Sequence, residues 1–149
     1  MSFSKHRHVK RHIDKRLFIE INCNNVPVKT LIDTGAECSV MGENVFKRIF
    51  ENKSTRLRNS GPIFGLAGQM VETMGEVDIS IQNTTISVRV SKYSNDNFDM
   101  ILGMDALTPL QAKIDCEGYY ITLKGHKYFN KGAFSQEFSQ VAYTLPVLW

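Results

Sequence analysis

The sequence predicts a mostly β-stranded domain that carries one or two short helices. Three observations lead to this fold class: several segments alternate apolar with polar residues, turn-forming residues separate these segments, and only two stretches show helical spacing. The chain has 149 residues, of which 42% are hydrophobic and 22% are charged. This length and composition are typical of a single globular domain, and they exclude wholesale disorder, a collagen-like repeat and a coiled coil.

Alternation predicts three β-hairpins. Their turns are expected at Asn24-Asn25, which tolerate the positive φ of a tight turn, at Gln82 to Thr85, and at Glu117-Gly118. The arms of these hairpins are, in chain order, 17–23 with 26–32, 77–81 with 86–90, and 113–116 with 119–123. The second hairpin has the clearest alternation, because Val77, Ile79 and Ile81 share one face.

The remaining elements lie between these hairpins. Helical spacing of apolar residues predicts a helix over 43–50, and a second short helix is expected over 105–110 with Asp105 as its N-terminal cap. Residues 62–71 are expected to form two extended arms around a glycine-bearing tip. An apolar run at 100–102 ends at Gly103.

The predicted organisation is a basic leader or linker at 1–16, one domain at 17–123, and a tail or linker at 124–149. Six of the eighteen basic residues lie in the first segment, together with one acid. This basic arm is interpreted as a solvated leader, with weak nucleic-acid or acidic-partner contact as the alternative. Three histidines in the arm, His6, His8 and His12, have no complementary cluster elsewhere, so no metal site is predicted.

Cysteine usage and hydropathy indicate an intracellular protein. The three cysteines, Cys23, Cys38 and Cys116, lack the Cys-x-x-Cys spacing of a zinc site and are odd in number, so reduced thiols are expected. No segment approaches the length of a membrane-spanning helix or has the apolar run of a secretion signal. We therefore expect a cytoplasmic location and no membrane partner.

The most informative segment is Leu31-Ile32-Asp33-Thr34-Gly35-Ala36, which places a carboxylate in a sharp turn at the end of an apolar strand. A carboxylate directly after buried apolar residues loses hydration, which costs free energy. We therefore expect this carboxylate to have hydrogen-bond partners or a functional role. Gly35 lets the backbone turn closely, and the Thr34 hydroxyl can hydrogen-bond across to another turn. Taken alone, the triplet is weak evidence for a catalytic site, because an isolated Asp-Thr-Gly is more often an Asx-type turn that only caps backbone groups.

The order of three motifs resembles the retropepsin family of aspartic proteases. These motifs are the Asp-Thr-Gly-Ala turn, a glycine-tipped hairpin some thirty residues later, and Ile101-Leu102-Gly103 followed by a short helix. The resemblance covers about 17–123 and is greatest to proteases of long-terminal-repeat retrotransposon polyproteins. It implies a single-lobed closed β-barrel or sandwich that acts as a two-fold symmetric homodimer, without metal or cofactor.

The resemblance also implies roles for individual residues. Asp33 would be the catalytic carboxylate, Thr34 a brace between subunits, and Gly35 part of the catalytic turn. Leu102 and Gly103 would pack behind that turn. Contacts to a bound peptide would come from Ala36, Glu37, Ile101 and a mobile flap formed by Gly65, Leu66, Ala67 and Gly68. Viral members often carry an arginine where this chain has Met104, so Glu37 must find another partner or face the substrate or solvent.

The chemistry of an aspartic protease requires two carboxylates that share one proton, so that one activates water while the other protonates the substrate. This chain contains one Asp-Thr-Gly triplet, and Asp78, Asp99, Asp105 and Asp115 lack the residues of a second. The second Asp33 is therefore expected from another copy of the chain, related by a two-fold axis.

The leading hypothesis is a homodimeric aspartic endopeptidase that processes a retroelement polyprotein in the cytoplasm or within virus-like particles. The alternative is a catalytically weak retropepsin-like domain that serves dimerisation or peptide binding in a host protein. A third interpretation treats the basic arm as a nucleic-acid module on a β scaffold, but the body lacks an aromatic-interleaved basic surface.

Overall fold

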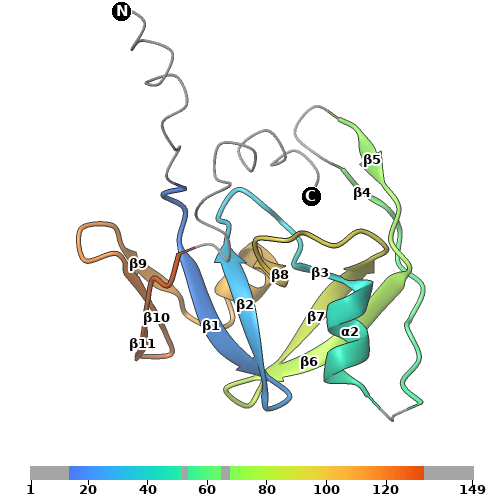
Figure 1. The fold of residues 1–149 in the computed structure, drawn as a ribbon, viewed down its shortest axis with the longest axis horizontal. Coiled ribbons are helices and arrows are strands. Elements are labelled where there is room, and N and C mark those ends of the chain that lie inside the picture. Colours follow the sequence, from blue (N-terminus) through green and yellow to red (C-terminus); the bar gives the residue numbers. More distant parts are fainter. Residues whose placement is uncertain (1–13, 52–53, 65–67, 133–149) are drawn as a thin grey trace, which may run out of the picture.

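Six strands form the main sheet, in the order β1-β2-β8-β3-β7-β6 (Figure 1). This computed structural model describes residues 14–51, 54–64 and 68–132. The strands of the sheet are, in chain order, β1 (Phe18–Cys23), β2 (Val26–Ile32), β3 (Val40–Gly42), β6 (Gly75–Ile81), β7 (Thr84–Ser91) and β8 (Met100–Leu102). The mostly β class expected from the sequence is confirmed.

The first two hairpins lie where alternation predicts them. Asn24 and Asn25 have φ values of 50° and 66°, and they join β1 to β2 in a two-residue turn. Gln82 and Asn83, with φ values of 51° and 60°, join β6 to β7 in the same way. This second turn is shorter than the expected 82–85, because the β-branched residues that follow Asn83 already pair with β6.

The centre of the sheet brings together two segments that are distant in sequence. β8 pairs in parallel with β2, with Ile32 opposite Leu102, and it pairs antiparallel with β3. β3 in turn pairs in parallel with β7. The carboxyl ends of β2 and β8 therefore lie side by side, so the residues after each strand, Asp33 and Gly103, are neighbours.

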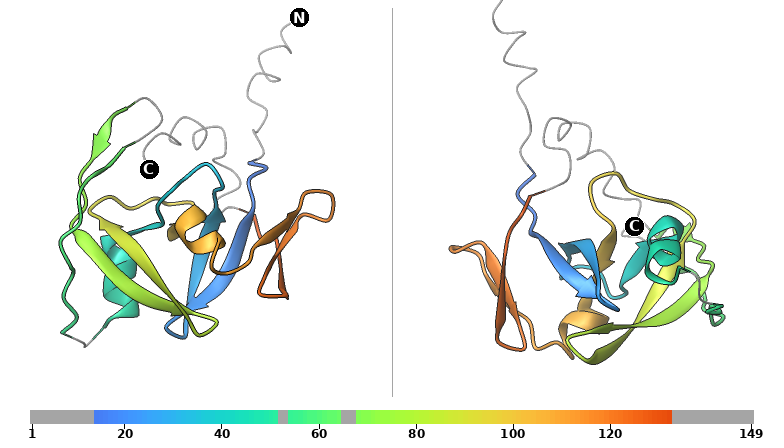
Figure 2. Two further views of the ribbon diagram at one scale, coloured as in Figure 1. Left: turned by 180° about the vertical axis from the view of Figure 1, so that it is seen from behind. Right: turned by 60° about the horizontal axis from the view of Figure 1, so that its bottom comes forward.

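The sheet curves until its first hairpin meets β6. The backbone N–H of Asn24 donates to the Ser80 carbonyl at 3.1 Å, and the N–H of Ser80 donates to Asn24 Oδ1 at 2.8 Å. The concave side encloses the main core, which contains the inward-facing residues of β1, β6 and β7 and the buried Val45 and Ile49 of α2 (Glu43–Ile49) (Figure 2). The curvature makes a half-barrel around a single apolar core.

The second helix, α3 (Met104–Leu107), directly follows β8. Its N-terminal cap is Gly103, without a side-chain cap, so the capping role expected for Asp105 is wrong. Asp105 instead lies in the first turn of the helix and receives hydrogen bonds from Ser39. Neither helix in the described part of the chain is long and apolar enough to cross a membrane.

A separate three-stranded sheet contains β9 (Lys113–Asp115), β10 (Tyr120–Leu123) and β11 (His126–Phe129). The third strand lies inside the segment expected to be a tail from residue 124, so the domain continues past that boundary. Lys124 and Gly125 have φ values of 50° and 82° and form the turn between β10 and β11. The Lys131 N–H donates to the Phe18 carbonyl at 2.7 Å, which attaches the end of this unit to β1.

The expected glycine-tipped hairpin has its two arms at β4 (Ile63–Phe64) and β5 (Met70–Val71). It projects on the same side of the molecule as the loop that follows β2 (Figures 1 and 2). Gly68 precedes β5 with a φ of 81°, whereas the expected tip residues Gly65, Leu66 and Ala67 lie outside the described residues.

Candidate active site

The loop after β2 is a tight turn built around the half-buried side chain of Asp33. The Asp33 N–H donates to the Leu102 carbonyl at 3.0 Å, and the Ala36 N–H donates to the Asp33 carbonyl at 3.1 Å. One carboxylate oxygen, Oδ1, accepts the Gly35 N–H at 2.9 Å. This bond is that of an Asx-type turn, and it orients the carboxylate without using Oδ2, which makes no hydrogen bond with the described residues.

Gly103 packs directly behind this turn. A Cβ atom at Gly103 would lie 2.7 Å from the carbonyl oxygens of both Ala36 and Cys38, so the position accepts only glycine without movement. The two residues after Gly103 hold the same segment, since Met104 N–H donates to the Ala36 carbonyl at 2.8 Å and Asp105 N–H donates to the Glu37 carbonyl at 3.1 Å. The start of α3 thus fixes the backbone that follows Asp33.

A buried polar group completes this support. The Ser39 side chain is fully buried, and its hydroxyl donates to Asp105 Oδ1 at 2.6 Å while it accepts the Gly103 N–H at 3.0 Å. The Ser39 N–H donates to the other oxygen of Asp105 at 3.2 Å. Sequence reasoning missed Ser39, because a serine next to β3 gives no local signal of a partner 66 positions away.

Ile101 belongs to a small second core behind the turn. It is 5% exposed and clusters with Phe18, Leu31 and Phe98, with Ala36 packed against the group. Glu37 is exposed. The structure therefore brings Asp33 to Glu37 together with Ile101, Leu102 and Gly103, whereas Gly68 lies apart in the β4–β5 hairpin.

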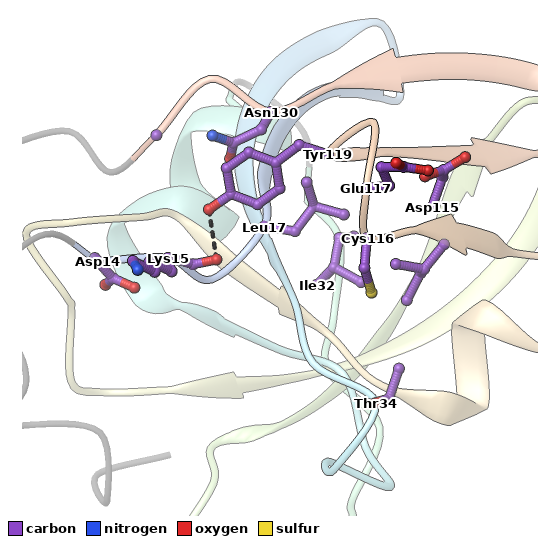
Figure 3. A pocket seen from close by; sticks show the side chains of 12 residues that line it. Asp14, Lys15, Leu17, Ile32, Thr34, Asp115, Cys116, Glu117, Tyr119 and Asn130 are labelled. Carbon is purple, nitrogen blue, oxygen red and sulfur yellow. Dashed lines mark hydrogen bonds between the residues drawn. The ribbon is translucent and has the colours of Figure 1, made fainter.

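Thr34 is exposed and lies at one end of a pocket of about 750 Å³ (Figure 3). Leu17 and Ile32 contribute an apolar wall, and the β9–β10 turn around Cys116 contributes another. The Tyr119 hydroxyl donates to the backbone carbonyl of Lys15, which holds the segment before β1 at the rim. The face of the molecule beside Thr34 is thus hollow and partly apolar.

All three cysteines are free thiols. Burial, with the nearby Asp99 charge as a smaller contribution, raises the pKa of Cys23 to about 12. Burial also raises the pKa of Cys38, which lies between Glu37 and Ser39 in the segment after the turn. Both thiols stay protonated at neutral pH, and Cys116 is the exposed thiol of the three. Among the described residues, no group of three or more His, Cys, Asp or Glu is arranged to hold a metal ion.

A curved sheet with an Asp-Thr-Gly turn after one central strand, supported by Ile-Leu-Gly after its parallel neighbour, is the single-lobed fold of retropepsin-like aspartic proteases. The family profile described as aspartyl protease matches residues 11–115, and the chain belongs to that family.

Two solved structures share this fold. The retroviral protease-like domain of Ddi1 from Leishmania major aligns with a TM-score of 0.54 and 20% identity, covering 81% of this chain and 94% of that one. EIAV protease, in complex with the inhibitor HBY-793, aligns with a TM-score of 0.53 and 28% identity, covering 71% of this chain and 98% of that one. The retropepsin-like architecture expected from the sequence is therefore confirmed.

Curated relatives of the chain include DNA damage-inducible protein 1 and a DDI1 homolog. The Saccharomyces cerevisiae DNA damage-inducible protein 1 is 27% identical over 100 residues, which is 66% of this chain and 23% of that protein. Protein DDI1 homolog 2 from Xenopus laevis is 28% identical over 104 residues, 68% of this chain and 26% of that protein. The chain thus spans about a quarter of the length of the curated relatives that it matches.

Proposed function

We propose that the protein is an aspartic endopeptidase that works as a homodimer, with one Asp33 from each subunit in the catalytic pair. The observation that carries the proposal is the geometry of Asp33: its carboxylate is oriented by the Gly35 N–H while Oδ2 makes no bond with the described residues. Thr34, in the same turn, is exposed and lines a pocket on the surface of the molecule, where a second copy can approach.

In the proposed reaction, the two carboxyl groups share one proton. The ionised Asp33 takes a proton from water as the water oxygen bonds to the peptide carbonyl carbon, and the protonated Asp33 gives its proton to the carbonyl oxygen. In the second step the two Asp33 residues exchange roles. The Asp33 that gave its proton to the carbonyl oxygen takes a proton from a hydroxyl of the tetrahedral intermediate, and the C=O bond re-forms as the C–N bond breaks. The Asp33 that took a proton from water gives it to the leaving nitrogen. Two adjacent carboxyl groups cannot both ionise readily, because their negative charges repel each other, so the pair titrates in two steps.

The substrate in this proposal is an extended polypeptide. The exposed Glu37 and the neighbouring Ala36 would contact the peptide beside the catalytic pair, with Ile101 behind them. The β4–β5 hairpin, including Gly65, Leu66, Ala67 and Gly68, would cover the peptide and add hydrogen bonds to it as a neighbouring strand.

Two sources of substrate are compatible with this chemistry. The motif order favours a retroelement polyprotein, whereas the likeness to DNA damage-inducible proteins favours a cellular protein substrate. A chain that is found in one reading frame with reverse transcriptase would support the polyprotein, and a chain joined to other cellular domains would support a host protein.

The test of the proposed activity is cleavage of a peptide library at mildly acidic pH by wild type, Asp33→Asn and Asp96→Asn. Asp96 is an exposed aspartate with no bond to the described residues, so it is a matched control. We expect Asp33→Asn to lose at least about a hundredfold in activity and to remain a folded dimer, because the pair loses the charge that activates water. Residual activity within about tenfold of wild type would contradict the catalytic assignment.

The alternative is a retropepsin-like domain in a host protein that serves dimerisation or peptide binding with little or no cleavage, and it is compatible with relatives of which the chain spans about a quarter. It predicts that wild type and Asp33→Asn bind library peptides equally and that neither cleaves them. Cleavage by wild type alone would exclude this alternative.

A further inference from the structure

The β4–β5 hairpin is continued by a stem, residues 58–62 before β4 and 72–74 after β5, and this stem is attached to β6, an edge strand of the main sheet. Arg58 and Glu76 exchange backbone hydrogen bonds, N–H to carbonyl in each direction, both at 2.9 Å. Gly75, with a φ of 138°, permits this approach, because a Cβ atom there would lie 2.6 Å from the Arg58 carbonyl oxygen. The segment that leads into β4 therefore lies directly against the start of β6.

The Arg58 side chain strengthens this attachment. Its Nη2 donates to Glu76 Oε2 at 2.9 Å, to Asp78 Oδ1 at 2.8 Å and to Ser87 Oγ at 3.3 Å. The Ser87 hydroxyl also donates to Asp78 Oδ1, at 2.8 Å. One guanidinium thus connects the hairpin stem to both β6 and β7.

A second arginine, Arg89, belongs to the sheet and contacts the stem. Arg89, on β7, donates through Nη1 to the Gly61 carbonyl at 3.2 Å, and its Nε lies 3.9 Å from Glu76 Oε1. Glu76 therefore lies between the two guanidinium groups. The two sides of the stem are also joined to each other, because the hydroxyls of Ser60 and Thr73 are 3.0 Å apart.

We propose that Arg58 and Arg89 are positioning residues that set the orientation of the β4–β5 hairpin relative to the sheet, and through it the binding of an extended polypeptide beside Asp33. This inference rests on the proposed function. The residues act through the hairpin and do not touch the reacting atoms.

The exposure of these groups separates positioning from general stability. Arg58 is half exposed, and exposed ion pairs contribute little to global stability. In the described part of the hairpin each arm has two strand residues, and the cross-strand pair Phe64 and Met70 is 69% and 57% exposed, so the arms bury little apolar surface. The orientation of the hairpin must therefore depend on its stem.

Two members of this network, Asp78 and Arg58, have pKa values shifted in the directions that keep both groups charged. The Ser87 hydroxyl, and after it the Arg58 guanidinium, lower the pKa of Asp78. The carboxylates of Glu76 and Asp78, in turn, raise the pKa of Arg58 by hydrogen bonding. Asp78 and the guanidinium thus remain a charged pair at mildly acidic pH.

The test compares Arg58→Ala and Arg58→Lys with wild type, and Lys47→Ala is the matched control. Lys47 forms an exposed ion pair with Glu43 on α2, at 3.5 Å, away from the hairpin. For Arg58→Ala we expect amide hydrogen exchange at 63–64 and 70–72 to rise about three- to fivefold, with exchange in β6 and β7 and the melting temperature unchanged. We also expect KM for a reporter peptide to rise by a similar factor, with a smaller change in kcat.

Arg58→Lys should recover part of the effect, because a lysine restores the charge with fewer hydrogen bonds. Asp78→Asn, at an exposed position, provides a second variant and should change the exchange in the same two segments. Unchanged exchange in the hairpin of both Arg58→Ala and Asp78→Asn, or an equal rise across all strands, would overturn the inference. The exchange result stands without peptidase activity, so failure of the proposed function is recognised separately, by an inactive wild type.

Discussion

At the scale of single residues, the geometry of the Asp33 turn depends on the absence of a side chain at Gly103. Replacing it with alanine would place a Cβ atom 2.7 Å from two backbone carbonyl oxygens, those of Ala36 and Cys38. Both oxygens belong to the segment that follows Asp33, so relief of this contact must move the turn. Hydrogen bonds from Met104 and Asp105 oppose that movement.

We predict that Gly103→Ala lowers the free energy of unfolding by about 1–3 kcal/mol, as overpacking does in a well-packed site. Peptidase activity should also fall under conditions where the variant is still fully folded, because the Asp33 carboxylate is displaced. Urea unfolding and peptide cleavage would measure the two effects. Gly61→Ala is the control for stability, since no atom of the described residues lies within 4 Å of a Cβ placed at Gly61, and it should leave the free energy of unfolding close to wild type.

The residues of the turn could be predicted from the sequence, whereas part of their support could not. Asp33, Thr34 and Gly35 are consecutive, so a local motif identifies them. The bond between Ser39 and Asp105 joins residues 66 positions apart and exists only because β8 pairs with both β2 and β3. Sequence reasoning instead assigned Asp105 to a helix cap, which is the usual role of such a residue at a helix start.

At the scale of elements, the β1–β2 turn offers a matched pair of asparagines. Both have positive φ, but only Asn24 hydrogen-bonds through its side chain, accepting the Ser80 N–H at 2.8 Å. Asn25 is exposed. The first asparagine therefore links two edges of the curved sheet, while the second only has to tolerate the turn.

We predict that Asn24→Gly lowers the free energy of unfolding by about 1 kcal/mol, the typical net value of one hydrogen bond. Asn25→Gly should leave it unchanged or raise it slightly, because an Asn-Gly pair suits this type of turn. Glycine at both positions removes any difference in φ strain from the comparison. Equal stabilities of the two variants in thermal unfolding would show that the link to Ser80 contributes nothing.

Hairpins with one buried face were predictable from alternation, and the strand that was missed explains the limit of that signal. Three of the four residues of β11 are exposed, so the strand has no apolar face for a pattern to reveal. It pairs with β10 through its backbone and is attached to β1 through Asn130 and Lys131. These contacts depend on tertiary structure and leave no periodic trace in the sequence.

At the scale of the whole molecule, the protomer contains one half of the proposed catalytic pair. Thr34 is exposed beside a pocket of about 750 Å³, and Ile114 on its rim is 41% exposed. A second copy placed about a two-fold axis near Thr34 would cover this face and bring the two Asp33 turns together. The proposed function therefore predicts a specific result when active and inactive copies are mixed.

The prediction is that Asp33→Asn protein inhibits wild-type protein by forming mixed dimers. A mixed dimer has one Asp33 carboxylate, which cannot supply both the base and the acid. With random exchange of subunits, an equal amount of Asp33→Asn should reduce the activity of a fixed amount of wild type to about half, and a ninefold excess should reduce it to about a tenth.

The double variant Asp33→Asn with Ile114→Asp should inhibit much less, because a charge on the apolar rim weakens pairing with wild type. Peptide cleavage after overnight mixing measures each ratio, and sedimentation confirms that dimers are present. Wild-type activity that does not change at a ninefold excess of Asp33→Asn, under conditions where mixed dimers are detected, would show that each chain is catalytically complete without its partner.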